Sequence, residues 1–225
     1  MRNHPTFVAC AALMLSSCSS GPPALPEDIV GSAATCAAVA ASRARSAIAD
    51  PATPFTLEQQ GQVIHYAMLA GAADPAFSRA NANGVVTQMQ SIAGRLDDED
   101  WKALTPLCST AFPAADLTHT VTLPEADEEA QMACYGLGEF MVRALGAYNE
   151  TYRDAVVRYN GLLNKLDASV QEQMTKKDIG PDMHAERSAE KNKALATAAK
   201  LGPPVKTLDA CIQRFPPDTE IKLPT

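Results

Sequence analysis

The amino-acid sequence predicts an all-α protein, built as a tandem repeat of two disulfide-closed helical bundles with about four helices each. Three observations carry this prediction: the composition, the helical spacing of apolar residues, and two short signatures that each occur twice. Of the 225 residues, 46% are hydrophobic but only 5% are aromatic, and alanine is abundant. This mix favours closely packed helices, because β-sheets are enriched in aromatic and β-branched residues.

The two signatures mark where each repeat begins and ends. The opening signature is Leu-Pro-Glu, eight further residues and then Cys, and it occurs from Leu25 to Cys36 and from Leu123 to Cys134. The closing signature is Cys, three residues and then Phe-Pro, and it occurs at residues 108–113 and 211–216. One unit therefore ends, and its copy begins, in the middle of the chain.

The N-terminal segment predicts export and a lipid anchor. An apolar run at residues 7–15 is too short to span a bilayer and ends in Leu15-Ser16-Ser17-Cys18. This order resembles the lipobox of bacterial lipoproteins. The resemblance implies cleavage before Cys18, a lipid on its sulfur and, with Ser19 next, an outer-membrane location facing the periplasm. An ordinary secretory signal cut near Ser20 is the alternative.

The expected divisions are 1–17 as signal peptide, 18–24 as lipidated tether, 25–113 as repeat one, 114–122 as linker, 123–216 as repeat two and 217–225 as C-terminal tail.

Helix-start residues and apolar spacing predict four helices in the first repeat. Pro26 suits the first turn of a helix, where its missing N–H is harmless. Thr56 to Gln59 forms a capping-box pattern at the start of the second helix. Asp74-Pro75 is expected to open the third, and Pro106 to kink or shorten the fourth. The expected helices lie near residues 26–48, 56–72, 75–96 and 97–108.

The second repeat predicts the same order of elements, with a longer second helix. Ile179-Gly180-Pro181 should end that helix. The third helix is rich in charge and alanine, so we expect it to be the most exposed. Between the repeats, the β-like run at residues 117–121 is too isolated to form a sheet. The expected helices lie near residues 125–146, 149–177, 182–200 and 205–215.

Four cysteines remain after Cys10, which lies in the apolar run, and Cys18 are set aside. An even number in an exported chain indicates disulfides. Four cysteines allow three pairings, and only Cys36–Cys108 with Cys134–Cys211 gives both repeats the same bridge. A zinc site of all four thiolates is the alternative. Zinc ligands usually include pairs only a few residues apart, which this spacing lacks.

The sequence offers few candidates for catalysis or metal binding. It contains no His-x3-His, Cys-x2-Cys, Gly-x-Ser-x-Gly or glycine-rich phosphate loop. His65 has no identifiable carboxylate partner and is interpreted as a packed or surface histidine. Residues 97–100, all acidic, are interpreted as a solvated helix cap, because the glycine and final glutamate of a calcium loop are missing. We expect no catalytic residue, no metal and no cofactor.

Three tyrosines form the best candidate binding surface. Tyr148, Tyr152 and Tyr159 are four and seven residues apart, and exposed tyrosine is favoured in interfaces. The same spacing would also suit a helical core. The net charge of -7 argues against nucleic acid as a partner, because such binding needs a basic footprint.

These observations favour a non-enzymatic lipoprotein of the cell envelope that binds an unidentified envelope protein. Periplasmic acid-stress chaperones and immunity proteins against secreted toxins include small helical modules closed by one disulfide. This chain resembles both groups in size, helicity and cysteine use. Two alternatives remain: a carrier of an apolar small molecule between helices, and a hydrolase with carboxylates that converge in the fold.

Overall fold

The computed structural model describes residues 24–217, which contain eight α-helices, two short 3-10 helices and no β-strand. The all-α prediction is confirmed. The helices of the first half are α1 (Ile29–Ser46), α2 (Leu57–Gly71), α3 (Arg79–Ala93) and α4 (Asp98–Ala111), followed by η1 (Pro113–Ala115). Those of the second half are α5 (Asp127–Gly146), η2 (Asn149–Tyr152), α6 (Arg153–Lys176), α7 (His184–Ala198) and α8 (Pro204–Arg214).

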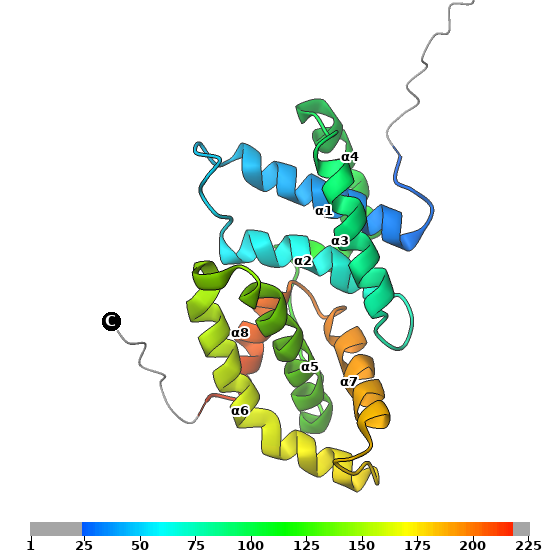
Figure 1. The fold of residues 1–225 in the computed structure, drawn as a ribbon, viewed down its shortest axis with the longest axis vertical. Helices are drawn as coiled ribbons and strands as arrows, with labels where there is room; N and C mark the ends of the chain where they lie inside the picture. The colour runs from blue at the N-terminus through cyan, green and yellow to red at the C-terminus, as the bar shows by residue number, and fades with distance from the viewer. Residues whose placement is uncertain (1–23, 218–225) are drawn as a thin grey trace, which may run out of the picture.

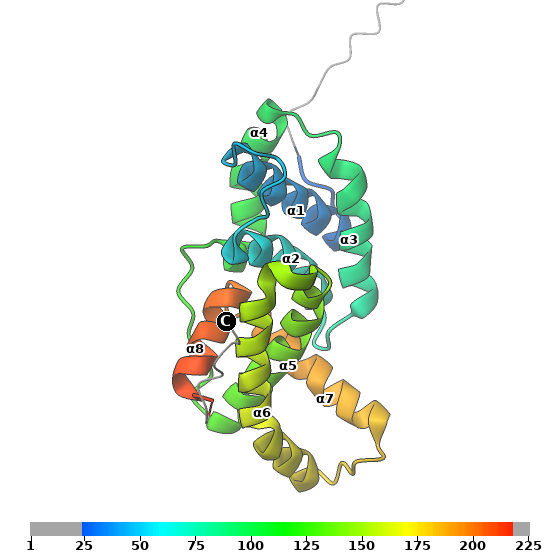
Figure 2. The same ribbon diagram turned by 60° about the vertical axis from the view of Figure 1, so that its left-hand side comes forward.

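Each half is arranged around its first helix. In the first half α1 packs against α2, α3 and α4, and in the second half α5 packs against α6, α7 and α8 (Figure 1). The halves are not identical, because α2 packs against α3 whereas α6 packs against α8. Helix α2 also contacts α7 and α8, so it lies at the junction of the two halves (Figure 2).

One disulfide closes each half. Cys36 of α1 is bonded to Cys108 of α4, with 5.4 Å between their Cα atoms. Cys134 of α5 is bonded to Cys211 of α8, with a Cα separation of 5.8 Å. This is the pairing that the repeated signatures predict, and in both halves it ties the first helix to the last.

The helix starts of the first half follow their capping side chains. The predicted capping box is present: Gln59 N–H donates to Thr56 Oγ1 at 3.2 Å, and Thr56 N–H donates to Gln59 Oε1 at 2.9 Å. The first helix begins at Ile29 and not at Pro26. Asp28 is its N-cap and accepts a hydrogen bond from Gly31 N–H at 2.7 Å.

The predicted start of the third helix at Pro75 is wrong. Helix α3 begins at Arg79, where the Oγ of Ser78 accepts a hydrogen bond from Asn81 N–H at 3.2 Å. The chain before it is held in a loop, because Phe77 is buried and its N–H donates to the carbonyl of Asn192 at 3.1 Å. Burying this ring against the second half takes precedence over the local helix-start signal.

The prediction that α7 is the most exposed helix is also wrong. Helices α3 and α4 each bury two residues, whereas α7 buries Leu195, Ala196 and Ala198. Gly136 of α5 permits this burial. A Cβ at Gly136 would lie 3.3 Å from the backbone N of Leu195, so the two helix backbones approach closely there.

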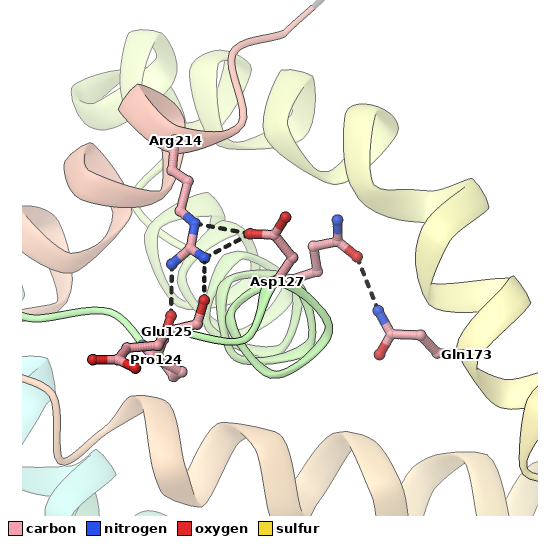
Figure 3. Close-up of polar contacts among 6 residues, drawn as sticks. Pro124, Glu125, Asp127, Gln173 and Arg214 are labelled. Carbon is pink, nitrogen blue, oxygen red and sulfur yellow. Dashed lines mark hydrogen bonds and ion pairs between the residues drawn. The ribbon is translucent and has the colours of Figure 1, made fainter.

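The second half is held together at its ends by Arg214 (Figure 3). The guanidinium of Arg214, at the end of α8, donates to the carbonyls of Pro124 and Glu125 at 2.6 and 2.7 Å. It also pairs with Asp127, the first residue of α5, at 2.6 Å. These bonds explain why α5 begins at Asp127 and not at Glu125 as predicted. Further along α5, Gln173 of α6 donates to Gln131 at 2.9 Å.

Replacing Arg214 by alanine should lower the free energy of unfolding by about 2 kcal/mol, because charged hydrogen bonds to two carbonyls and a carboxylate are lost together. Guanidinium denaturation followed by circular dichroism measures the change. Arg153→Ala is the matched control, since Arg153 makes only an exposed pair with Glu150 and should cost less than about 1 kcal/mol. Equal costs for the two variants would contradict the role given to Arg214.

The buried side chains of the two halves form one continuous hydrophobic cluster. The rings of Phe77 and Phe140 meet edge to face across the junction, with centroids 5.5 Å apart. Gln60 of α2 donates to the Tyr148 hydroxyl at 3.0 Å, and Tyr152 donates to the carbonyl of Phe55 at 2.9 Å. The junction is therefore a packed interface and not a loose linker.

Candidate functional site

An open groove of about 380 Å³ lies where the two halves meet. Its walls come chiefly from α2, α3 and α5. Single residues of α1 and α7, Phe77 in the loop before α3 and residues 147–148 after α5 complete it. Small-molecule sites in proteins commonly have volumes of roughly 300–1,000 Å³ and predominantly apolar walls. The groove falls within this range.

The walls of the groove are apolar because the three helices present aliphatic and aromatic side chains to it. The aliphatic and aromatic lining residues include Val63, Ile64, Phe77, Val85, Met89 and Phe140. Ala67, Ala82 and Ala144 lie between them, and their small side chains leave the space open. Val86 stands at the mouth and is 49% exposed.

The polar groups of the groove are few and lie among the apolar walls. They are Gln60, Asn83, Arg79, Arg143 and Tyr148, and the lining contains no acidic side chain. Gln60 donates from Nε2 to the Tyr148 hydroxyl at 3.0 Å. Arg79 is the first residue of α3, and Arg143 lies in the last turn of α5. An apolar cavity with cationic side chains can bind an apolar molecule and can also interact with a negative charge on it.

The three predicted tyrosines do not share an exposed surface. Tyr148 is 46% exposed and lines the groove. Tyr152 is buried beneath it, with the two rings in edge contact at 5.7 Å, and Tyr159 has no exposed surface. The Tyr152 hydroxyl donates to the carbonyl of Phe55, and Tyr159 lies near Glu58 of α2 and Asp209 of α8. The expectation of a binding surface is therefore wrong for Tyr152 and Tyr159. Only Tyr148 is exposed at the groove.

His65 belongs to the junction and not to an accessible site. It is completely buried on α2, and its Nε2–H donates to the carbonyl of Ala199 at the end of α7, at 2.7 Å. Its Nδ1 has no hydrogen-bond partner among the described residues. Burial lowers the pKa of His65 to about 4; the bond to Ala199 opposes this shift, and the nearby His119 adds to it. The imidazole is therefore neutral near neutral pH.

The acidic cluster at the start of α4 acts as a helix cap. Asp97 accepts hydrogen bonds from the N–H groups of Glu99 and Asp100 at 2.9 and 2.8 Å. Negative side chains are favourable at this end of a helix. Within residues 24–217, no group of three or more histidine, cysteine or acidic side chains is arranged to hold a metal ion. No helix in this range has the length and apolar character needed to cross a bilayer.

The predicted lipidation residue, Cys18, lies outside the described residues, as do the predicted signal peptide and most of the tether. No known protein family, curated protein or solved structure matches this chain. Sequence reasoning missed the groove, although the helical spacing of apolar residues predicted the helices that line it. A helical stripe does not reveal which of its members meet another helix and which face a gap.

Proposed function

We propose that this protein is a non-enzymatic binding protein that carries an apolar small molecule in the groove between its two halves. The observation that carries the proposal is the groove itself, a space of about 380 Å³ with predominantly apolar walls. The lining offers aliphatic, aromatic, amide, phenol and guanidinium groups. These groups bind a ligand through burial, hydrogen bonds and charge, with no bond made or broken.

A protein partner is the second candidate. It is supported by the exposure of Val86 and Tyr148 at the mouth of the groove, because an apolar side chain of a partner could contact both. The carrier is the better supported of the two, because the groove has the volume of a small-molecule site. A stable protein interface would need a far more extended surface than the groove. Stress chaperones and immunity proteins act in this second way, by binding another protein.

The proposed location is the bacterial cell envelope, with the protein held to the outer membrane by a lipid on Cys18 and facing the periplasm. The lipobox sequence supports the anchor. The two disulfides support an oxidising compartment such as the periplasm, because cytosolic thiols are kept reduced.

We also propose that the halves are two copies of one disulfide-closed four-helix unit. The ends of their last helices support this. Phe112 and Phe215 follow α4 and α8 with similar backbone angles, and each donates its N–H to the carbonyl of the last cysteine of its half, at 2.9 and 2.8 Å. The different packing of α6 and α2 is then a divergence between the copies.

The carrier is tested on the Cys18→Ser protein, which lacks the proposed lipid anchor, by purifying it from the periplasm without detergent and extracting it with organic solvent. Mass spectrometry of the extract should identify an apolar small molecule. Ala144→Trp should reduce its amount at least about tenfold, because the indole fills the groove from α5. Ala189→Trp is the matched control, since Ala189 is exposed on α7 and does not line the groove. Equal extracts from both variants would contradict the proposal.

A further inference from the structure

We infer that the groove binds a single-chain amphiphile with an anionic head, such as a long-chain carboxylate, and that Arg79 and Arg143 bind the head. This inference rests on the proposed function, because it names the class of ligand for the same groove. Its basis is a difference between these two arginines and every other arginine that the structure describes.

Arg79 and Arg143 make no hydrogen bond or ion pair with another described residue, and both line the groove. The other seven arginines within residues 24–217 all have partners. Three bind acidic side chains: Arg153, Arg158 and Arg214. Four donate to neutral oxygens: Arg43, Arg45, Arg95 and Arg187. Among the described residues, the guanidinium groups without a protein partner are therefore the two at the apolar groove.

The surroundings of the groove favour an anion there. The whole chain carries a formal charge of -7, yet the groove lining contains two positive side chains and no negative one. Arg79 is also the first residue of α3, whose first turn contains no acidic side chain to offset the positive end of the helix dipole. Guanidinium groups bind carboxylates and phosphates through paired hydrogen bonds, so either head would suit.

The apolar walls select the rest of the ligand. A free carboxylate or phosphate would leave apolar lining residues such as Ile64, Val86 and Met89 exposed to water. An alkyl chain would remove this surface from water, which favours binding. A ligand with one alkyl chain and one anionic head satisfies both features, and a volume of about 380 Å³ suits one chain.

Isothermal titration calorimetry of the oxidised mature chain, residues 18–225, tests the inference. A Cys18→Ser substitution removes the proposed lipid site, so that no detergent competes for the groove. Three probes share a twelve-carbon chain and differ in the head: laurate is anionic, dodecanol is neutral and dodecyltrimethylammonium is cationic. Each is used below the concentration at which it forms micelles. We expect laurate to bind about tenfold more tightly than dodecanol, and the cationic probe to bind most weakly.

Two double variants separate the contribution of the anionic head to the affinity from that of the alkyl chain. Arg79→Gln with Arg143→Gln should bring laurate down to the affinity of dodecanol and leave dodecanol unchanged. Arg95→Gln with Arg153→Gln removes the same charge away from the groove, and it should keep the preference for laurate. Circular dichroism checks that both variants are folded.

The outcomes distinguish the inference from the function on which it rests. The inference of an anionic head is overturned if the protein that keeps Arg79 and Arg143 binds laurate and dodecanol equally. It is also overturned if the Arg79/Arg143 double variant keeps the full preference for laurate. Either result leaves the proposed carrier function intact. Failure of all three probes to bind overturns the carrier and the inference together. Tight binding of the cationic probe overturns the charge selection.

Discussion

Replacing Cys134 and Cys211 together by alanine should lower the free energy of unfolding by about 4 kcal/mol. The disulfide spans 77 residues of sequence, and in the chain-entropy model a closed loop of this size restricts the unfolded chain by about that amount. The Cys36→Ala/Cys108→Ala variant should lose a similar free energy, because its disulfide spans 72 residues. Denaturant titrations followed by circular dichroism give both values.

The control for this prediction is the unsubstituted protein after reduction of its disulfides. Reduced protein should be less stable than either double variant, since it loses both crosslinks at once. Peptide mapping under non-reducing conditions should recover the Cys36–Cys108 and Cys134–Cys211 pairs. A loss below about 1 kcal/mol on removing either pair, or a recovered Cys108–Cys134 bridge, would contradict the role given to the disulfides.

The second large effect concerns acid. The stability of the protein should fall as the pH is lowered from about 6.5 to about 4, and His65 should contribute about 3 kcal/mol of that loss. In the unfolded chain this histidine takes up a proton near its ordinary pKa, whereas burial keeps it neutral in the folded protein down to about pH 4. Well above pH 6.5 it is neutral in both states, so its titration does not change the stability there.

His65→Gln isolates this contribution, because glutamine keeps an N–H donor for the carbonyl of Ala199 but does not titrate. The variant should lose stability at pH 8 through imperfect packing, and it should lack about 3 kcal/mol of the decline between pH 7 and pH 4. His184→Gln, at the exposed first residue of α7, controls for the loss of a histidine outside the core. Identical slopes for the original protein and His65→Gln would refute the assignment.

The helices could be predicted because their signals are local. The capping box at Thr56, the cap at Asp97 and the break around Gly180 all depend on residues a few positions apart. The disulfide pairing was predictable for another reason: the repeated signatures place each cysteine in an equivalent position. Where such signals compete with packing, prediction failed, as at Pro75, where burial of Phe77 moved the helix start to Arg79.

The candidate site could not be predicted because it depends on how helices far apart in sequence meet. Phe77 and Phe140 are neighbours across the junction, and nothing in the spacing of either segment indicates this. The tyrosine stripe illustrates the same limit. Periodicity correctly places Tyr148, Tyr152 and Tyr159 near one side of a helical segment, but only the packing of α6 against other helices decides that Tyr159 is buried.

The central claim is that the groove is where this protein binds its ligand, and photocrosslinking in living bacteria tests it most directly. A benzophenone amino acid replaces Val86 at the mouth of the groove, or Ala189 on the exposed face of α7 as the control. After irradiation, the intact mass of the protein should increase by that of a small apolar molecule at position 86 and remain unchanged at position 189. No adduct at position 86, or the same adduct at both positions, would contradict the claim.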